Sequence, residues 1–335
     1  MKLLILAAAS LAVVSCGSLS LEDLEFHAWK LKFGKVYRTL EEEAWRKDIW
    51  LSTRRRVLAH NILADQGIKT YRMGMNHFSD MDDEEHRSTV LLKSDMFLNE
   101  TKTTALHGAH SSRQKGGTKL PESFDWRDKN CVTAVKMQGQ CGSCWAFSTT
   151  GALESHTCIK YDHLPSLSEQ QLVDCSKPYG TQGCHGGWMY EALQYVHENG
   201  GIDTEESYPY EGEESSCRFK QSGVGAKCDG YVTVTPRDEL ALQETVATVG
   251  PVTIAIDVYK DFWGYQSGIY DEPLCNQSSL LHAMLVVGYG SEDGQDYWLV
   301  KNSWDSTWGE NGYIRMSRNK SNQCDIATYA YYPKM

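Results

Sequence analysis

The number of cysteines is the feature that most constrains the fold of this chain. Its 335 residues include eleven cysteines and three N-x-[ST] sequons, at Asn99, Asn276 and Asn319. This combination is typical of a compartment that forms disulfides and adds glycans, and not of a reducing cytosol. Because disulfides use cysteines two at a time, at least one cysteine is left over. The sequence therefore predicts a secreted, disulfide-bonded chain with a free thiol.

The N-terminus also predicts secretion. Residues 1–17 begin with one lysine, continue as an apolar run interrupted only by Ser10, and end in small residues. This is the pattern of a signal peptide. The alternatives are a buried N-terminal helix and a bacterial lipoprotein box that ends at Cys16. No later run reaches the roughly 18 apolar residues of a membrane span, so we expect no stable membrane anchor.

Charge divides the rest of the chain near residue 119. Residues 18–119 carry 17 Lys and Arg against 15 Asp and Glu, whereas residues 120–335 carry 15 against 29. The formal charge of −11 for the whole chain argues against a nucleic-acid partner. We expect the mildly basic part to pair with the acidic part at neutral pH, and acid to weaken the pairing by protonating carboxylates.

The hydrophobic periodicity also differs between the two parts. Residues 21–33 and 41–63 have the apolar spacing of helices, and residues 99–119 are polar, as in an exposed linker. Further on, helical spacing recurs at residues 167–173 and 188–199. Short strand-like runs follow at residues 252–258, 283–289, 297–301 and 312–316. This order predicts an α+β fold with helices first and an antiparallel sheet second.

Residues 138–148 concentrate reactive groups and read Gln-Gly-Gln-Cys-Gly-Ser-Cys-Trp-Ala-Phe-Ser. Cys144 precedes a stretch of helical spacing, and the start of a helix favours a thiolate, the reactive form of cysteine. A Cys-x-x-Cys pair is also compatible with a redox pair or half of a zinc site. A zinc site needs a second such pair, and the sequence has no other Cys-x-x-Cys or Cys-x-x-His. We therefore expect no metal.

A nucleophile needs a base, and the base needs a group that orients it. His282 stands at the start of an apolar strand, and Asn302 follows another strand in the segment Val-Lys-Asn-Ser-Trp that ends at Trp304. An imidazole can take the thiol proton and return it to a leaving amine, while a carboxamide fixes the ring tautomer. Trp304 would shield this contact from water. Taken alone, a histidine beside an apolar strand is more often a structural residue than a catalytic one. The combination of His282 and Asn302 with the Cys144 motif reverses this preference.

Together these residues resemble the papain family of cysteine peptidases, whose signature cysteine is followed by a distant histidine and asparagine. The resemblance extends over nearly the whole chain after the signal. It includes residues 125–127 (Asp-Trp-Arg), 166–175, 183–187, 207–210, 287–290 and 297–304. In the first part, Glu42, Arg46, Trp50, Asn61 and residues 74–80 match the inhibitory propeptides of the cathepsin L-like branch. Several stretches are closest in pattern to cathepsin S.

The resemblance implies a two-lobed, papain-like α+β fold preceded by a helical inhibitory prodomain. The boundaries it suggests are a signal peptide at 1–17, a propeptide at 18–119 and a mature peptidase at 120–335. It implies that Cys144, His282 and Asn302 are catalytic and that Gln138 donates to the oxyanion of the reaction intermediate. It implies no cofactor.

Disulfide pairs also follow from the resemblance. The family pairs Cys141 with Cys184, Cys175 with Cys217 and Cys275 with Cys324. Cathepsin S carries a further pair at the positions of Cys131 and Cys228. This arrangement leaves Cys158 as a buried, inert thiol.

Carried over by position, the substrate pocket has an apolar wall that suits Leu, Val or Met at the second residue before the cleaved bond, over Phe or Arg. Its residues are Gly187, Trp188, Met189, Ala255, Leu280, Ala283 and Tyr329. Two departures from the family pattern are Asp305 and Asp325, where glycine is usual. Asp is tolerable there even if the backbone needs a positive φ angle, although Gly is better.

The sequence thus predicts a cysteine endopeptidase made as a secreted zymogen for lysosomal or endosomal protein breakdown, with release from the cell as a further destination. We expect a monomer whose partners are protein and peptide substrates, its own propeptide and, by family resemblance, cystatin-type inhibitors. The alternative is a catalytically silent binding or inhibitory protein with the same fold. Loss of one of the four catalytic residues would favour this alternative, and all four are present.

Overall fold

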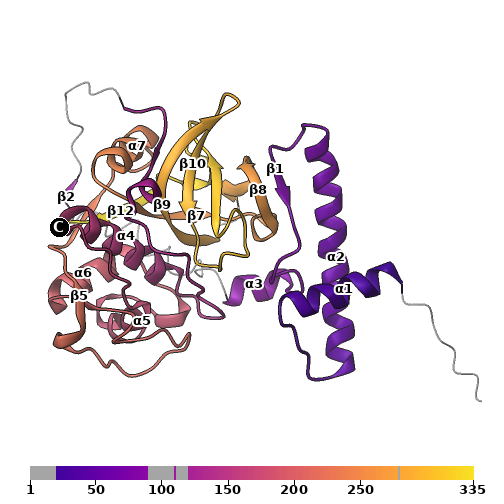
Figure 1. The fold of residues 1–335 in the computed structure, drawn as a ribbon, viewed down its shortest axis with the longest axis horizontal. Helices are drawn as coiled ribbons and strands as arrows, with labels where there is room; N and C mark the ends of the chain where they lie inside the picture. Colours follow the sequence, from indigo (N-terminus) through magenta and orange to yellow (C-terminus); the bar gives the residue numbers. More distant parts are fainter. Residues whose placement is uncertain (1–19, 90–108, 111–119, 278–279) are drawn as a thin grey trace, which may run out of the picture.

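A computed structural model describes residues 20–89, 109–110, 120–277 and 280–335. Within these ranges the chain forms an N-terminal region (residues 20–89) and a C-terminal region (residues 120–335). In Figure 1 the N-terminal region lies on one side of the sheet, next to β8, and helices α4 to α6 lie on the other side. The predicted signal peptide and sequon Asn99 lie outside the described residues. No helix within the described ranges is long and apolar enough to span a membrane.

Two crossed helices form most of the N-terminal region, as the periodicity predicted. They are α1 (Leu21–Lys32) and α2 (Leu40–Asp65), followed by β1 (Tyr71–Met73) and α3 (Asp83–Thr89). Ser20 and Thr39 begin the two long helices by accepting hydrogen bonds from backbone amides of the first turn. The helices cross at a buried cluster of Phe26, Trp29 and Trp50.

The longer strands of the C-terminal region all follow its helices, which confirms the predicted α+β class. Its helices are α4 (Cys144–Tyr161), α5 (Glu169–Cys175), α6 (Met189–Asn199) and α7 (Glu239–Thr248). Its longer strands are β7 (Val252–Asp257), β8 (Tyr265–Tyr270), β9 (Leu281–Glu292), β10 (Gln295–Lys301), β11 (Tyr313–Ser317) and β12 (Tyr329–Pro333). Its short strands are β3 (Phe124–Asp125), β4 (Ile202–Asp203), β5 (Val224–Ala226) and β6 (Tyr231–Thr233). A further short strand, β2 (Ala109–His110), precedes this region and pairs with β6.

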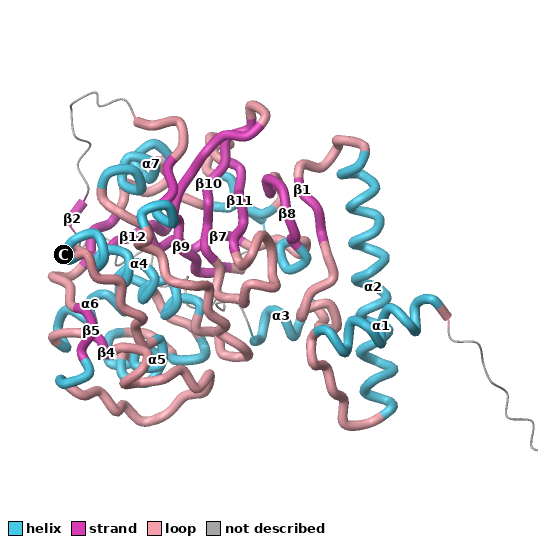
Figure 2. Tube along the Cα trace, in the orientation of Figure 1, coloured by secondary structure: helices cyan, strands magenta, loops and turns pink. Residues whose placement is uncertain are grey.

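The main sheet has the strand order β1-β8-β11-β10-β9-β7-β12-β6-β2 and is largely antiparallel. Figure 2 shows the strands gathered beside a separate group of helices. Two large apolar cores match these groups, one among the strands and one among α4, α5 and α6. The second core also contains Ala255 and Ala283, so α4 packs against β7 and β9 where the two lobes meet.

The N-terminal region joins the main sheet through β1, which pairs antiparallel with β8. Tyr71 lies opposite Gly268, whose φ is 92°. A Cβ atom at position 268 would lie 2.5 Å from the carbonyl oxygen of Thr70. The close approach of the two strands therefore depends on glycine at this position.

Candidate active site

Cys144 is the first residue of α4 and is fully buried. Its Sγ accepts a hydrogen bond from the backbone amide of Ala283 on β9, at 3.4 Å. One turn further along α4, Ser148 Oγ donates to the carbonyl oxygen of Met284, at 2.6 Å. The helix start and the start of β9 are thus fixed against each other, and the predicted nucleophile lies at the junction of the lobes.

His282 and Asn302 come together because β9 and β10 are antiparallel neighbours. His282 lies at the start of β9, and Asn302 directly follows the end of β10. His282 Nε2 is 2.8 Å from Asn302 Oδ1, and the same oxygen accepts the amide hydrogen of Ser303. Since a carboxamide oxygen only accepts hydrogen bonds, His282 carries its proton on Nε2. Among the described residues, nothing bonds to its Nδ1.

Trp304 covers this contact, as the sequence predicted. Its ring stacks on His282 with centroids 4.5 Å apart and planes inclined by 28°. Phe78 of the N-terminal region packs edge-on against Trp304 at 4.8 Å. Asn76 Nδ2 donates to the carbonyl oxygen of Trp263, at 2.6 Å. The 74–80 motif therefore lies directly against the wall of the site.

Burial decides the protonation of the two reactive groups in this form of the chain. It raises the pKa of Cys144 to about 12, although the amide hydrogens of Ala283, Trp145 and Cys144 itself act in the opposite direction. It lowers the pKa of His282 to about 4, although the hydrogen bond that the ring donates to Asn302 Oδ1 acts in the opposite direction. The sequence predicted that the helix start favours a thiolate. Here the cost of burying the charge outweighs that effect, and the thiol is neutral.

Gln138 is buried and held on several sides. Its backbone amide donates to the Ser303 carbonyl oxygen at 2.9 Å, and its Oε1 accepts from Ser303 Oγ at 2.6 Å. Its Nε2 donates to the carbonyl oxygen of Cys141, at 3.0 Å. We did not predict a role for Ser303, although it lies inside the motif that contains Asn302.

Three strands bring part of the predicted pocket together. Ala283 on β9 lies opposite Ala255 on β7, which in turn lies opposite Tyr329 on β12. The rings of Tyr329 and Trp188 are 5.2 Å apart. Met189 belongs to the same apolar core, whereas Leu280 packs against the core of the other lobe. A Cβ at Gly187 would meet the ring of Trp145 at 2.7 Å, so the backbone must lie close to that ring.

Three of the predicted disulfides are confirmed. They are Cys141–Cys184, Cys175–Cys217 and Cys275–Cys324.

The predicted Cys131–Cys228 pair is wrong, because Cys131 is bonded to Cys158. Cys158 lies near the end of α4, with its Cα 5.5 Å from that of Cys131. Cys228 lies elsewhere, against α6, with its Sγ 3.6 Å from the carbonyl oxygen of Leu193. Among the described cysteines, Cys144 and Cys228 are free. Burial raises the pKa of Cys228 to about 11, so Cys228 and not Cys158 is the inert thiol.

Both positions where aspartate replaces the usual glycine have positive φ angles, 67° at Asp305 and 56° at Asp325. Asp305 compensates in part, because its Oδ1 accepts the amide hydrogen of Thr307. Sequon residues Asn276 and Asn319 are both exposed.

Comparisons with known proteins cover both regions. The family model described as papain family cysteine protease matches residues 120–334, and the cathepsin propeptide inhibitor domain (I29) matches residues 26–86. Cathepsin L of Sarcophaga peregrina is 48% identical over 316 residues, which is 92% of each chain. Digestive cysteine proteinase 2 of Homarus americanus is 46% identical over 320 residues, which is 95% of this chain and 97% of the relative.

Cathepsin S of Bos taurus is 44% identical over 315 residues, which is 93% of each chain. Among solved structures, digestive procathepsin L 3 of the Tenebrio molitor larval midgut superposes with a TM-score of 0.85 at 41% identity. That match covers 94% of this chain and all of the other. Relatives named cathepsin L and cathepsin S are thus similar to this chain at nearly equal identity.

Proposed function

Because the chain belongs to the papain family of cysteine proteases and carries a cathepsin propeptide inhibitor domain, we propose that Cys144 is the nucleophile of a zymogen. His282 is the general base, and Asn302 orients it. The observation that carries this assignment is the buried His282–Asn302 hydrogen bond beneath the ring of Trp304. Ala283, the residue after His282, donates its backbone amide hydrogen to Cys144 Sγ.

The first half of the reaction uses the ring nitrogen opposite Asn302. Asn302 holds the proton on His282 Nε2, so Nδ1 has the lone pair that takes the thiol proton. The thiolate then attacks the carbonyl carbon of the peptide bond and forms a tetrahedral oxyanion. Ser303 and Cys141 hold the carboxamide of Gln138, which makes it a preorganised donor toward that oxyanion, together with the amide of Cys144.

The second half returns the proton. The imidazolium of His282 protonates the leaving amine, and the acyl group stays on Cys144 as a thioester. The same imidazole then removes a proton from water, and the resulting hydroxide attacks the thioester carbonyl carbon. The C–S bond breaks, the acid product leaves, and the imidazolium returns its proton to the Cys144 thiolate. Trp304 excludes bulk water from the His282–Asn302 contact during both halves.

Activity requires that the reactive pair be exposed. Cys144 and His282 are both fully buried, and burial favours the neutral thiol and the neutral imidazole over a thiolate–imidazolium pair. We propose that a signal peptide of residues 1–17 and a propeptide of residues 18–119 are removed to give a mature enzyme that starts at Leu120. N-terminal sequencing of the secreted and the acid-treated protein tests both boundaries.

Single substitutions in the acid-activated enzyme test the assigned roles. We expect Cys144→Ala to abolish hydrolysis of a peptide substrate and His282→Ala to lower kcat by at least about 10²-fold. Gln138→Ala should lower kcat by roughly 10²-fold while KM changes little, since the oxyanion forms only on the way to the intermediate. Unchanged kcat in either of the last two variants would contradict the role assigned to that residue.

We propose that the pocket takes a medium-sized apolar side chain at the second residue before the cleaved bond. Tyr329 and Trp188 form an aromatic wall over the small side chains of Ala255 and Ala283. None of the predicted pocket residues is acidic, so we expect no ion-pair partner for an arginine, and we expect the two rings to leave less room for a phenylalanine than for a leucine. A peptide library should show Leu, Val or Met ahead of Phe and Arg, and preference for Arg or Phe would refute the proposal.

Delivery to the lysosome or endosome is the destination we propose, because a zymogen that enters the secretory pathway needs acid to expose its site. Relatives named digestive proteinases support release from the cell as the second destination. Glycan analysis at Asn276 and Asn319 together with imaging of the tagged chain distinguishes the two. We further propose that the mature enzyme is a monomer inhibited by cystatin-type proteins at the cleft, which gel filtration and inhibition assays test.

A further inference from the structure

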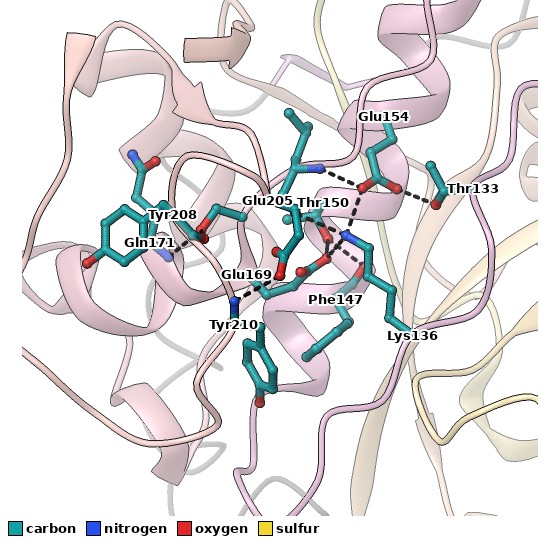
Figure 3. Close-up of polar contacts among 12 residues, drawn as sticks. Thr133, Lys136, Phe147, Thr150, Glu154, Glu169, Gln171, Glu205, Tyr208 and Tyr210 are labelled. Carbon is teal, nitrogen blue, oxygen red and sulfur yellow. Dashed lines mark hydrogen bonds and ion pairs between the residues drawn. The ribbon is translucent and has the colours of Figure 1, made fainter. Parts of the chain in front are cut away.

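Three carboxyl groups surround one lysine beneath the segment that carries Gln138, and we call Lys136, Glu154, Glu169 and Glu205 the carboxyl cluster (Figure 3). Lys136 Nζ donates to Glu154 Oε1 at 3.0 Å, to Glu169 Oε1 at 2.7 Å and to the Leu167 carbonyl oxygen at 3.0 Å. Glu154 lies on α4, Glu169 begins α5, and Glu205 lies on the loop after β4. Lys136 is the one cation that hydrogen-bonds these acids among the described residues, so the negative charges of the cluster outnumber its positive charge.

Two oxygen atoms of the cluster have no donor. Glu169 is 1% exposed, and its Oε1 accepts from both Lys136 and Thr150. Its Oε2 and the Oε2 of Glu205 are buried without a hydrogen-bond donor anywhere in the described parts of the chain. The two carboxyl groups lie side by side in Figure 3. Two ionised carboxylates can only accept hydrogen bonds, so these two oxygens can satisfy each other only if one of the carboxyl groups carries a proton.

The surroundings favour retention of that proton at neutral pH. Burial is the largest influence on Glu169 and raises its pKa to about 7, although the charge of Lys136 acts in the opposite direction. Burial also raises the pKa of Glu205, against the amide hydrogen of Tyr210. The charged and titratable groups that face the pair from the packed elements are Lys136, Glu154, Tyr210 and, from β10, Lys301.

The carboxyl cluster is connected to the Gln138 segment on two sides. On one side, Lys136 precedes Gln138 by two residues, and its carbonyl oxygen accepts the amide hydrogen of Asp305. On the other side, the Tyr210 amide donates to Glu205 Oε1 at 2.8 Å, and the Tyr210 hydroxyl donates to the Gln138 carbonyl oxygen at 2.7 Å. The same hydroxyl contacts Ser143 Oγ, next to Cys144.

We propose that Glu169 and Glu205 share one proton and act as positioning residues for Gln138 while that proton is present. When the proton is lost, two adjacent carboxylates repel each other. Glu205 then no longer holds the backbone amide of Tyr210 in place, and the hydrogen bond from Lys136 to Glu169 changes its geometry. The carboxamide of Gln138 loses its fixed position, so kcat falls as the pH rises past neutrality. The link to kcat rests on the proposed role of Gln138, whereas the shared proton does not.

Kinetics of the acid-activated enzyme test the link. Glu205→Gln replaces the shared proton by an amide hydrogen that stays at every pH. We expect the alkaline fall of its kcat to move upward by at least about one pH unit, with KM within about twofold of the wild type. Glu206→Gln is the matched control, because it removes the same charge from the neighbouring exposed residue, and it should follow the wild type. If Glu205→Gln and the wild type have the same profile, the positioning role is wrong.

Infrared spectroscopy of the full-length Cys144→Ala precursor tests the proton itself, without any need for activity. We expect the C=O stretch of a protonated, buried carboxyl group at pH 6, and its loss above pH 8. The band should be absent from both Glu169→Gln and Glu205→Gln in this background and unchanged in Glu206→Gln. A wild-type precursor without the band at pH 6 would overturn the proposal even if Gln138→Ala shows the expected loss of kcat. Conversely, if the precursor shows the band but Gln138→Ala has a normal kcat, the shared proton stands and the role proposed for Gln138 is wrong.

Discussion

His86 of α3 is buried where the propeptide meets the enzyme, and it has an unusual environment for a histidine. Its ring lies 4.6 Å from the ring of Trp263. Neither ring nitrogen has a hydrogen-bond partner among the described residues. Burial lowers its pKa from 6.5 to about 4, although Asp83, Glu85 and Asp82 favour the charged form and Arg56 opposes it. The imidazole is therefore neutral in the zymogen at neutral pH.

This burial makes docking of the propeptide dependent on pH. A released propeptide has an ordinary histidine, so between pH 6.5 and 4 release takes up a proton. The contribution of His86 to docking is therefore complete above pH 6.5 and is lost as the pH falls toward 4. The shift in the pKa of His86 corresponds to a change of a few hundredfold in the docking equilibrium, or about 3 kcal/mol. The equilibrium changes by at most about tenfold per pH unit.

His86→Phe removes this proton uptake and keeps an aromatic ring against Trp263. The assay is the rate at which the full-length precursor is processed between pH 7 and 4, divided by the activity of the mature enzyme at each pH. For each unit by which the pH is lowered between 6.5 and 4, we expect the processing rate of the wild type to rise by up to about tenfold more than that of the variant. His27→Phe, at an exposed position of α1, is the control and should behave as the wild type. If His86→Phe keeps the wild-type dependence on pH, the reasoning is refuted.

Further predictions concern the disulfides, the tryptophan cover and the pocket. Peptide mapping under non-reducing conditions should recover Cys131 joined to Cys158, and a Cys131–Cys228 peptide would contradict the structure. Cys158→Ser should lower the unfolding free energy by roughly 2–4 kcal/mol, whereas Cys228→Ser should leave all bridges intact. Trp304→Ala should lower kcat by about tenfold or more, because water then reaches the His282–Asn302 bond, and a normal pH–rate profile would count against shielding. Tyr329→Ala should increase the relative rate for Phe at the second residue before the cleaved bond, which competition between Leu and Phe peptides measures.

The sequence predicted the elements with strong periodicity, and it predicted the catalytic set through family resemblance. Helices α1 and α2 have regular apolar spacing, and their ends differ little from the predictions. The contact between His282 and Asn302 follows once β9 and β10 pair as antiparallel neighbours. Helix α7 was not predicted, although Asp238 provides a recognisable N-cap by accepting from two amides of the first turn.

Contacts that depend on three-dimensional distance could not be predicted. The partner of Cys131 depends on where the end of α4 lies, and no spacing in the sequence reveals this. The acid response was expected from the carboxylates of an acidic enzyme, whereas the structure adds a neutral histidine buried against an aromatic wall. Tyr210 and Ser303 lie in the family-like segments 207–210 and 297–304, but their hydrogen bonds to Gln138 depend on how these segments pack against it.

The central claim is that Cys144 is the reactive thiol and that its burial in the zymogen silences it. The most direct measurement is labelling with an epoxide inhibitor of thiol proteases, with the modified residue located by mass spectrometry, before and after acid activation. The account predicts a label on Cys144 in the activated wild type, little label in the neutral precursor and none in the activated Cys144→Ala variant. A label on Cys228, or equal labelling of Cys144 in the precursor and the activated enzyme, would contradict it.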